Sequence, residues 1–104
     1  MKSTNYTVRM IGNTRRTVSG YIYSTGALRV GISNRDPRTG KALPTWTITE
    51  LRTGFRIGEA HTLTAARTEA AHISRRVSEA LAAFAADEPD YNPGIVPEYT
   101  IWAA

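Results

Sequence analysis

The chain contains no cysteine among its 104 residues. This absence excludes disulfide bonds, thiolate nucleophiles and zinc sites with cysteine ligands. No apolar run approaches the roughly 20 residues that a membrane-spanning helix needs, so we expect no contact with a membrane. The first residues, Met1 to Asn5, lack the hydrophobic stretch of a secretory signal. We therefore expect a cytoplasmic protein.

Acidic residues are scarce in the first part of the chain. Residues 1–58 hold ten of the thirteen basic residues and two of the nine acidic ones, a net charge of +8. Residues 59–104 hold three basic and seven acidic residues, a net charge of −4. Eleven of the basic residues are arginine, whose planar guanidinium suits bidentate contacts with phosphate or carboxylate. The asymmetry indicates either an anionic partner or a GC-rich genome that encodes arginine often.

Residues with the spacing of a catalytic or metal site are also lacking. The two histidines, His61 and His72, are eleven residues apart and have no partner at metal-ligand spacing. The carboxylates are scattered, and no glycine pattern forms a phosphate-binding loop. We expect no metal, no cofactor and no enzymatic activity.

A long amphipathic helix is the clearest feature that is present, and the spacing predicts it over residues 64–86. Its apolar residues recur at alternating spacings of four and three, which places them on one helix face. They are Ala66, Ala70, Ile73, Val77, Ala80 and Phe84. Thr64 is the expected N-cap, because its hydroxyl can accept a hydrogen bond from a free amide in the first turn. Pro89 ends the helix, since proline cannot continue it.

Alternating apolar and polar residues predict a sheet before the helix. The expected strands cover residues 5–11, 17–24, 27–33, 45–51 and 55–58. Five short antiparallel strands followed by one helix define an α+β domain over residues 1–86, with the helix packed on one sheet face. The other face of the sheet is expected to lie open.

Residues 87–104 are expected to form an acidic, aromatic arm that extends beyond this domain. The arm either packs on its own domain or binds a partner. In the second case Tyr91, Tyr99 and Trp102 would be its anchors, because aromatic residues dominate many protein interfaces.

The open sheet face is the leading candidate for a binding site. With Val18, Gly20 and Ile22 facing the helix, the opposite face collects arginines and tyrosines. These residues are Arg9, Tyr21, Tyr23, Arg29 and Arg56, and the loops add Arg15, Arg16, Arg35, Arg38 and Lys41. Arginine beside tyrosine suits phosphate neutralisation and base stacking, or strands laid in a groove. Solvated sheet faces of no function carry similar residues. We favour a non-enzymatic nucleic-acid-binding protein, with DNA or RNA as its partner.

One stretch resembles a known kind of DNA-binding domain. Trp46-Thr47-Ile48-Thr49, the turn at Thr53-Gly54 and the segment Thr62-Leu63-Thr64-Ala65-Ala66 resemble domains made of a three-stranded sheet and one helix. These are the arm-binding domains of phage and transposon tyrosine recombinases and the plant ethylene-response type. The resemblance covers about residues 27–72. It implies a sheet that enters the DNA major groove, with Arg29 and Arg56 reading the DNA.

A protein target is the alternative partner. A small domain without a catalytic region also looks like an accessory protein of a phage or mobile element. Such proteins include inhibitors and regulators, for example anti-CRISPR and host-takeover factors, which bind a host or phage protein. Here the acidic arm or the sheet surface would form the interface. Homodimerisation through a sheet edge or the helix is a third possibility.

Overall fold

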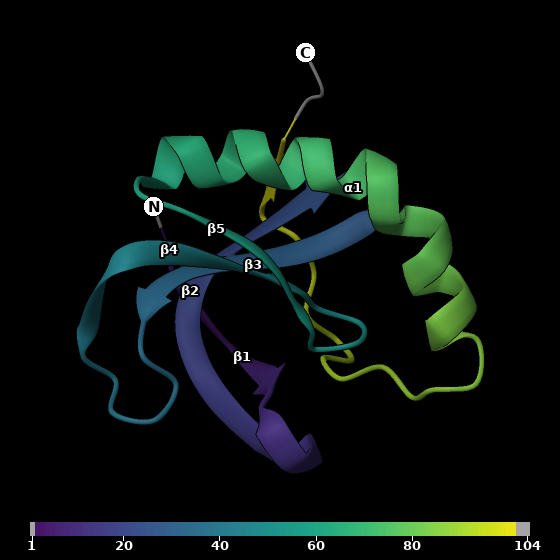
Figure 1. The fold of residues 1–104 in the computed structure, drawn as a ribbon, viewed down its shortest axis with the longest axis horizontal. Helices are drawn as coiled ribbons and strands as arrows, with labels where there is room; N and C mark the ends of the chain where they lie inside the picture. The colour runs from purple at the N-terminus through teal and green to yellow at the C-terminus, as the bar shows by residue number, and fades with distance from the viewer. Residues whose placement is uncertain (1, 102–104) are drawn as a thin grey trace.

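The computed structural model describes residues 2–101 and shows an antiparallel sheet packed against one long helix (Figure 1). This arrangement confirms the predicted α+β class. The elements are β1 (Thr4–Arg9), the short 3-10 helix η1 (Ile11–Asn13), β2 (Arg15–Thr25), β3 (Leu28–Arg35), β4 (Ala42–Glu50), β5 (Arg56–Ala60), α1 (Leu63–Ala85) and β6 (Tyr99–Thr100).

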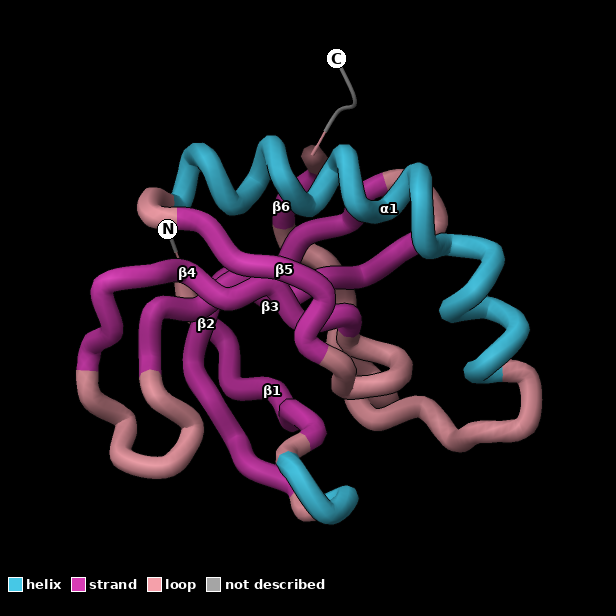
Figure 2. The backbone as a smooth tube through the Cα atoms, viewed as in Figure 1, coloured by secondary structure: helices cyan, strands magenta, loops and turns pink. Residues whose placement is uncertain are grey.

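The strands β1 to β5 follow one another in chain order, each antiparallel to the next. The short β6 pairs in parallel with β2. Strand β2 has eleven residues and changes partner midway: up to Gly20 it pairs with β1, and from Tyr21 it pairs with β3. Because of this change the sheet curls, and the β1–β2 hairpin bends away from α1 (Figure 2).

A first hydrophobic core lies between α1 and the sheet. Small residues of α1, such as Ala66 and Ala70, are fully buried and let the helix approach the strands closely. The other buried members are Tyr23, Leu28, Val30, Ile32, Ile48, Ala71, Ile73 and Ile101. Trp46 and Ile57 pack against this core from β4 and β5, on the face that the alternation predicts.

The start of α1 differs from the prediction. The N-cap is Thr62, whose hydroxyl accepts a hydrogen bond from the Ala65 amide at 3.0 Å. Thr64, the predicted cap, lies inside the first turn. The predicted apolar stripe holds in the first half of the helix, but Ala80 is exposed and Phe84 is 45% exposed. The late turns extend past the edge of the sheet, so these two positions have less protein to pack against (Figure 1).

A second hydrophobic core covers the face of the sheet opposite α1. It contains Tyr6, Val8, Val18, Ile22 and Leu51. The prediction that this face lies open is therefore wrong. The aromatic ring of Tyr6 lies over Gly31 of β3, where even a methyl group would overlap it. This close approach lets β1 fold over the sheet.

The two faces of β2 are exchanged relative to the prediction. Tyr21 and Tyr23 pack toward α1, whereas Val18 and Ile22 belong to the second core. The predicted alternation is correct, but both faces of β2 are covered. Alternation alone cannot decide which set of residues faces the helix in such a strand.

The turn between β4 and β5 is ordered by a buried carboxylate. Glu50 accepts hydrogen bonds from the Thr53 amide at 2.9 Å, the Thr53 hydroxyl at 2.7 Å and the Arg52 amide at 2.7 Å. From this turn the Arg52 guanidinium donates to the carbonyls of Ala85 and Glu88, at 3.1 and 3.2 Å. The Ala85 carbonyl also accepts a hydrogen bond from the Glu88 amide at 3.1 Å, so Arg52 adds a second donor at the end of α1.

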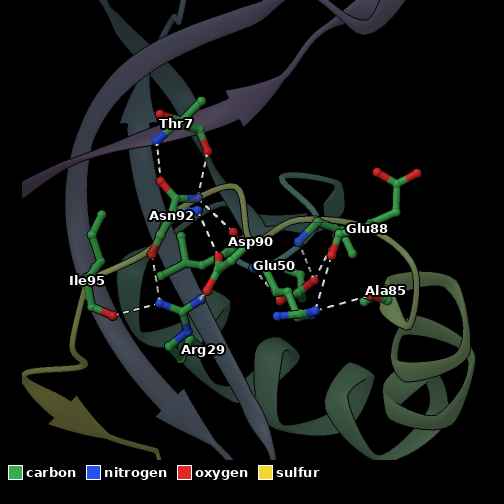
Figure 3. A network of polar contacts seen from close by, with 11 residues as sticks. Thr7, Arg29, Glu50, Ala85, Glu88, Asp90, Asn92 and Ile95 are labelled. Carbon is green, nitrogen blue, oxygen red and sulfur yellow. Dashed lines mark hydrogen bonds and ion pairs between the residues drawn. The ribbon is translucent and has the colours of Figure 1, made fainter.

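The arm after α1 packs on its own domain (Figure 3). Asn92 is buried, and its amide oxygen accepts a hydrogen bond from the Thr7 amide at 2.6 Å. Its amide nitrogen donates to the carbonyls of Thr7 at 3.0 Å and Leu51 at 2.7 Å. The ring of Tyr91 is buried against Gly54, and Tyr99 packs beside Tyr23 with ring centroids 5.6 Å apart. Trp102 lies outside the described residues.

Candidate functional site

A cleft of about 210 Å³ lies on the concave side of the curled sheet. Its apolar lining includes Val8 and Val18 from β1 and β2, and Pro37 and Leu43 from the β3–β4 connection and β4. Tyr6 lies at the base and is 2% exposed. Burial raises the pKa of the Tyr6 hydroxyl well above its usual value, so this group stays protonated.

Three arginines line the cleft. Arg35 comes from the end of β3, Arg9 from the end of β1 and Arg56 from the start of β5. Within residues 2–101, none of the side chains that line the cleft is acidic. The potential in such a recess is positive, and its low-dielectric walls strengthen the attraction of an anion.

Arg35 and Arg56 are available to an incoming ligand. Both are exposed. The Arg35 guanidinium makes a long contact of 3.5 Å with the Gly40 carbonyl. Arg56 forms an ion pair with Glu59 at 2.8 Å, but the two side chains are 59% and 50% exposed. Exposed pairs of this kind contribute little free energy, so a phosphate can compete for the guanidinium.

Arg9 is held more firmly. Its Nε donates to the Thr53 carbonyl at 3.1 Å and its Nη1 to the Asn13 side chain at 3.2 Å. The guanidinium carbon lies 4.4 Å from the ring centroid of Phe55 and 4.6 Å from that of Tyr91. These cation–π contacts fix the orientation of the side chain. Arg9 therefore contributes a positive charge in a fixed position at one end of the cleft.

Further basic residues surround the cleft on exposed loops and strand ends. Arg16 lies opposite Val8 in the β1–β2 pairing, and Arg38 and Lys41 lie in the β3–β4 connection. All three are exposed. Arg15 is exposed as well, and its guanidinium lies 4.0 Å from the centroid of the Tyr91 ring. None of these four residues lines the cleft itself, although Met10 and Pro37, which belong to the β1–β2 and β3–β4 connections, do.

Three of the predicted binding residues lie elsewhere. Tyr23 is 1% exposed and Tyr21 packs against the helix-side core, so neither ring faces the cleft. Burial also raises the pKa of the Tyr23 hydroxyl. Arg29 does face away from α1, as predicted, but it binds the arm: it forms an ion pair with Asp90 at 2.6 Å and donates to the Ile95 carbonyl at 2.7 Å.

The apolar side chains that line the cleft could not be identified from the sequence. Met10, Val18 and Leu43 are separated widely along the chain and become neighbours only because the sheet curls. The one local signal is the pair of glycines in adjacent strands, Gly20 and Gly31. A side chain at either position would overlap neighbouring atoms.

Fold and site together define a small α+β domain with a basic cleft on the inside of a curled sheet. Among residues 2–101, no three histidine, aspartate or glutamate side chains lie close enough to hold a metal ion. No helix in this part of the chain is long and apolar enough to cross a membrane. Comparison with protein-family models, curated proteins and solved structures finds no match for this chain.

Proposed function

We propose that this protein binds nucleic acid through the cleft, without catalysis, and acts in the cytoplasm. The observation that carries the proposal is the composition of the recess, which among residues 2–101 combines three arginines with apolar side chains and no acidic lining residue. Nucleic acids are polyanions with planar apolar bases, so they match both properties.

The exposed arginines supply the phosphate contacts. Arg35 and Arg56 lie at separate places along the cleft and can each form paired hydrogen bonds to phosphate oxygens. Arg16, Arg38 and Lys41 extend the positive surface beyond the cleft. With about four phosphates neutralised, we expect the logarithm of the affinity to fall with the logarithm of salt concentration with a slope of about −3.

This mode differs from a sheet that enters the major groove. One sheet face is covered by α1 and the other by the second core. In the part of the chain that the structure describes, neither face is free to lie flat against a duplex. The ligand must therefore approach the concave cleft and the loops at its ends.

The packing of the arm on its own domain favours a protein partner less than a nucleic acid. Tyr91 is buried, and Tyr99 packs beside Tyr23 and pairs with β2. Because both side chains take part in contacts within the domain, a partner could use them as anchors only after the arm had detached. We therefore keep nucleic acid as the proposed partner.

The test is fluorescence-anisotropy binding of labelled DNA and RNA to the full chain between about 50 and 300 mM salt. The double variant Arg35→Ala/Arg56→Ala is expected to bind about thirtyfold more weakly and to reduce the salt slope by nearly two. The matched control is Arg67→Ala/Arg76→Ala, which removes the same charge from exposed residues of α1, on the other side of the sheet.

Equal losses in the two double variants would show that only net charge matters, and would refute the cleft as the binding site. If the full chain binds no nucleic acid at the lowest salt concentration, the proposal is wrong. A pull-down for a protein partner would then be the next experiment.

A further inference from the structure

We infer that the cleft selects unpaired strands and holds one base between its apolar walls; this inference rests on the proposed function. The first argument is size. The cleft measures about 210 Å³, which is below the range of roughly 300–1,000 Å³ for pockets that enclose drug-sized ligands. Such a space admits one planar ring, whereas a double helix is far too wide and keeps its bases stacked and paired.

The second argument is the chemistry of the walls. Met10, Pro37 and Leu43 line the recess and are partly exposed, so they offer apolar surface to a ring, and the buried Val8 and Val18 complete the apolar lining. Thr47 and the more deeply buried Thr49 line the same recess from β4, and hydroxyls can donate to or accept from the edge of any base. The walls thus suit an aromatic heterocycle with polar edges, with little preference among bases.

The third argument is where the charges lie. Arg35 pairs with Ala42 and Arg56 with Thr49, so these two lining residues lie near opposite ends of β4. A base bound between them would place the phosphates on its two sides near the two arginines. Only a single strand offers a base and both of its flanking phosphates to the same cleft.

The experiment compares the affinity of the full chain for a single-stranded DNA, the RNA of the same sequence and the matching DNA duplex, by anisotropy at fixed salt. At least one of the single strands is expected to bind about tenfold more tightly than the duplex. Tighter binding of the duplex, or equal binding of all three, would overturn the inference. The proposed function would survive that result, whereas it would fail if none of the three bound.

Thr47→Trp tests the cleft directly, because an indole side chain fills the space that we assign to the base. It is expected to lower single-strand affinity about tenfold while the salt slope stays unchanged, since the arginines remain. Thr45→Trp is the matched control, with the same change at another half-buried residue of β4 that does not line the cleft. Equal effects of the two variants would contradict the inference.

Two further measurements keep the test valid if Thr47→Trp does not fold. Leu43→Trp fills the same cleft from another position of β4 and is expected to show the same loss. The unmodified protein can also be titrated into single strands that carry 2-aminopurine at successive positions. The fluorescence emission of 2-aminopurine changes when the base leaves the stack of its neighbours to enter the cleft. Unchanged emission at every position would refute the inference.

Discussion

Replacing Asn92 by aspartate should destabilise the fold, because it removes two hydrogen bonds that hold the arm against the domain. The Asn92 amide nitrogen donates to the half-buried carbonyl of Thr7 at 3.0 Å and to the buried carbonyl of Leu51 at 2.7 Å. The variant Asn92→Asp keeps the size of the side chain and its acceptor oxygen, but it removes both donors. It also places a carboxylate against two carbonyl oxygens.

The expected loss follows from the two orphaned acceptors. Each buried carbonyl without a donor costs about 1–3 kcal/mol, so the variant should lose about 4 kcal/mol of unfolding free energy. Domains of this size have about 5–15 kcal/mol in total. The melting temperature should therefore fall by roughly 15–30 °C.

Urea unfolding followed by circular dichroism measures this loss, with a lower midpoint and an unchanged m-value. Asn5→Asp is the control, because Asn5 is an exposed residue of β1, the strand that holds Thr7, and the charge change is identical. If the unfolding free energies of the two variants differ by less than about 1 kcal/mol, the assigned role of the Asn92 amide is refuted.

The pH dependence gives a second check. Burial against carbonyls raises the pKa of the introduced carboxyl above the value of about 3.9 in the unfolded chain. The protonated form is then favoured in the folded state and can donate to one carbonyl. The loss of unfolding free energy relative to the unmodified protein should be smallest below about pH 4. It should grow as the pH rises through the pKa of the introduced carboxyl in the folded state. A deficit that does not change with pH would contradict this account.

Three further predictions follow from other parts of the fold. Thr62→Ala should lower the unfolding free energy by about 1 kcal/mol through loss of the N-cap, whereas Thr64→Ala should leave it nearly unchanged; equal effects in urea unfolding would contradict the observed cap. Gly31→Ala should destabilise the domain by about 3 kcal/mol, because the new methyl group overlaps the Tyr6 ring, and an unchanged melting temperature would exclude that contact. Because the pKa of Tyr6 is raised by burial, stability should fall above about pH 10, where the unfolded chain ionises this hydroxyl and the folded chain does not. Between pH 10 and 11 the unfolding free energy of Tyr6→Phe should fall less than that of the unmodified protein. Equal dependence of the two unfolding free energies on pH would show that the Tyr6 hydroxyl is not the cause.

The sequence predicted the elements of the fold well, because their signals are local. Alternation in the strands and the alanine-rich stripe of α1 each depend on residues within one turn or one strand. The prediction was wrong about the second face of the sheet, which is buried. A strand such as β2 carries Tyr23 on one side and Ile22 on the other, and both are about 1% exposed. No local pattern tells which of two apolar faces meets the helix.

The candidate site was predictable only in part. Exposed loop arginines such as Arg35 and Arg38 can be read from the sequence, since turn-forming residues surround them. The role of Arg29 could not be read in this way, because its partner Asp90 is 61 residues away and is placed by the docking of the arm. The cleft itself depends on how strongly the sheet curls, and this follows from packing between distant strands.

The docking of Asn92 on β1 has a consequence for how the domain fluctuates. The Thr7 amide donates to the side chain of Asn92, and the Arg9 amide donates to the Gly54 carbonyl, at 2.6 and 2.9 Å. These two amides lie on the edge of β1 that faces away from β2, so the ladder with β2 does not protect them from hydrogen exchange. Release of the arm removes the acceptor of the Thr7 amide. A strand and an arm segment 85 residues apart therefore open as one cooperative unit, and the exchange rate of a single amide in β1 reports how often the arm detaches.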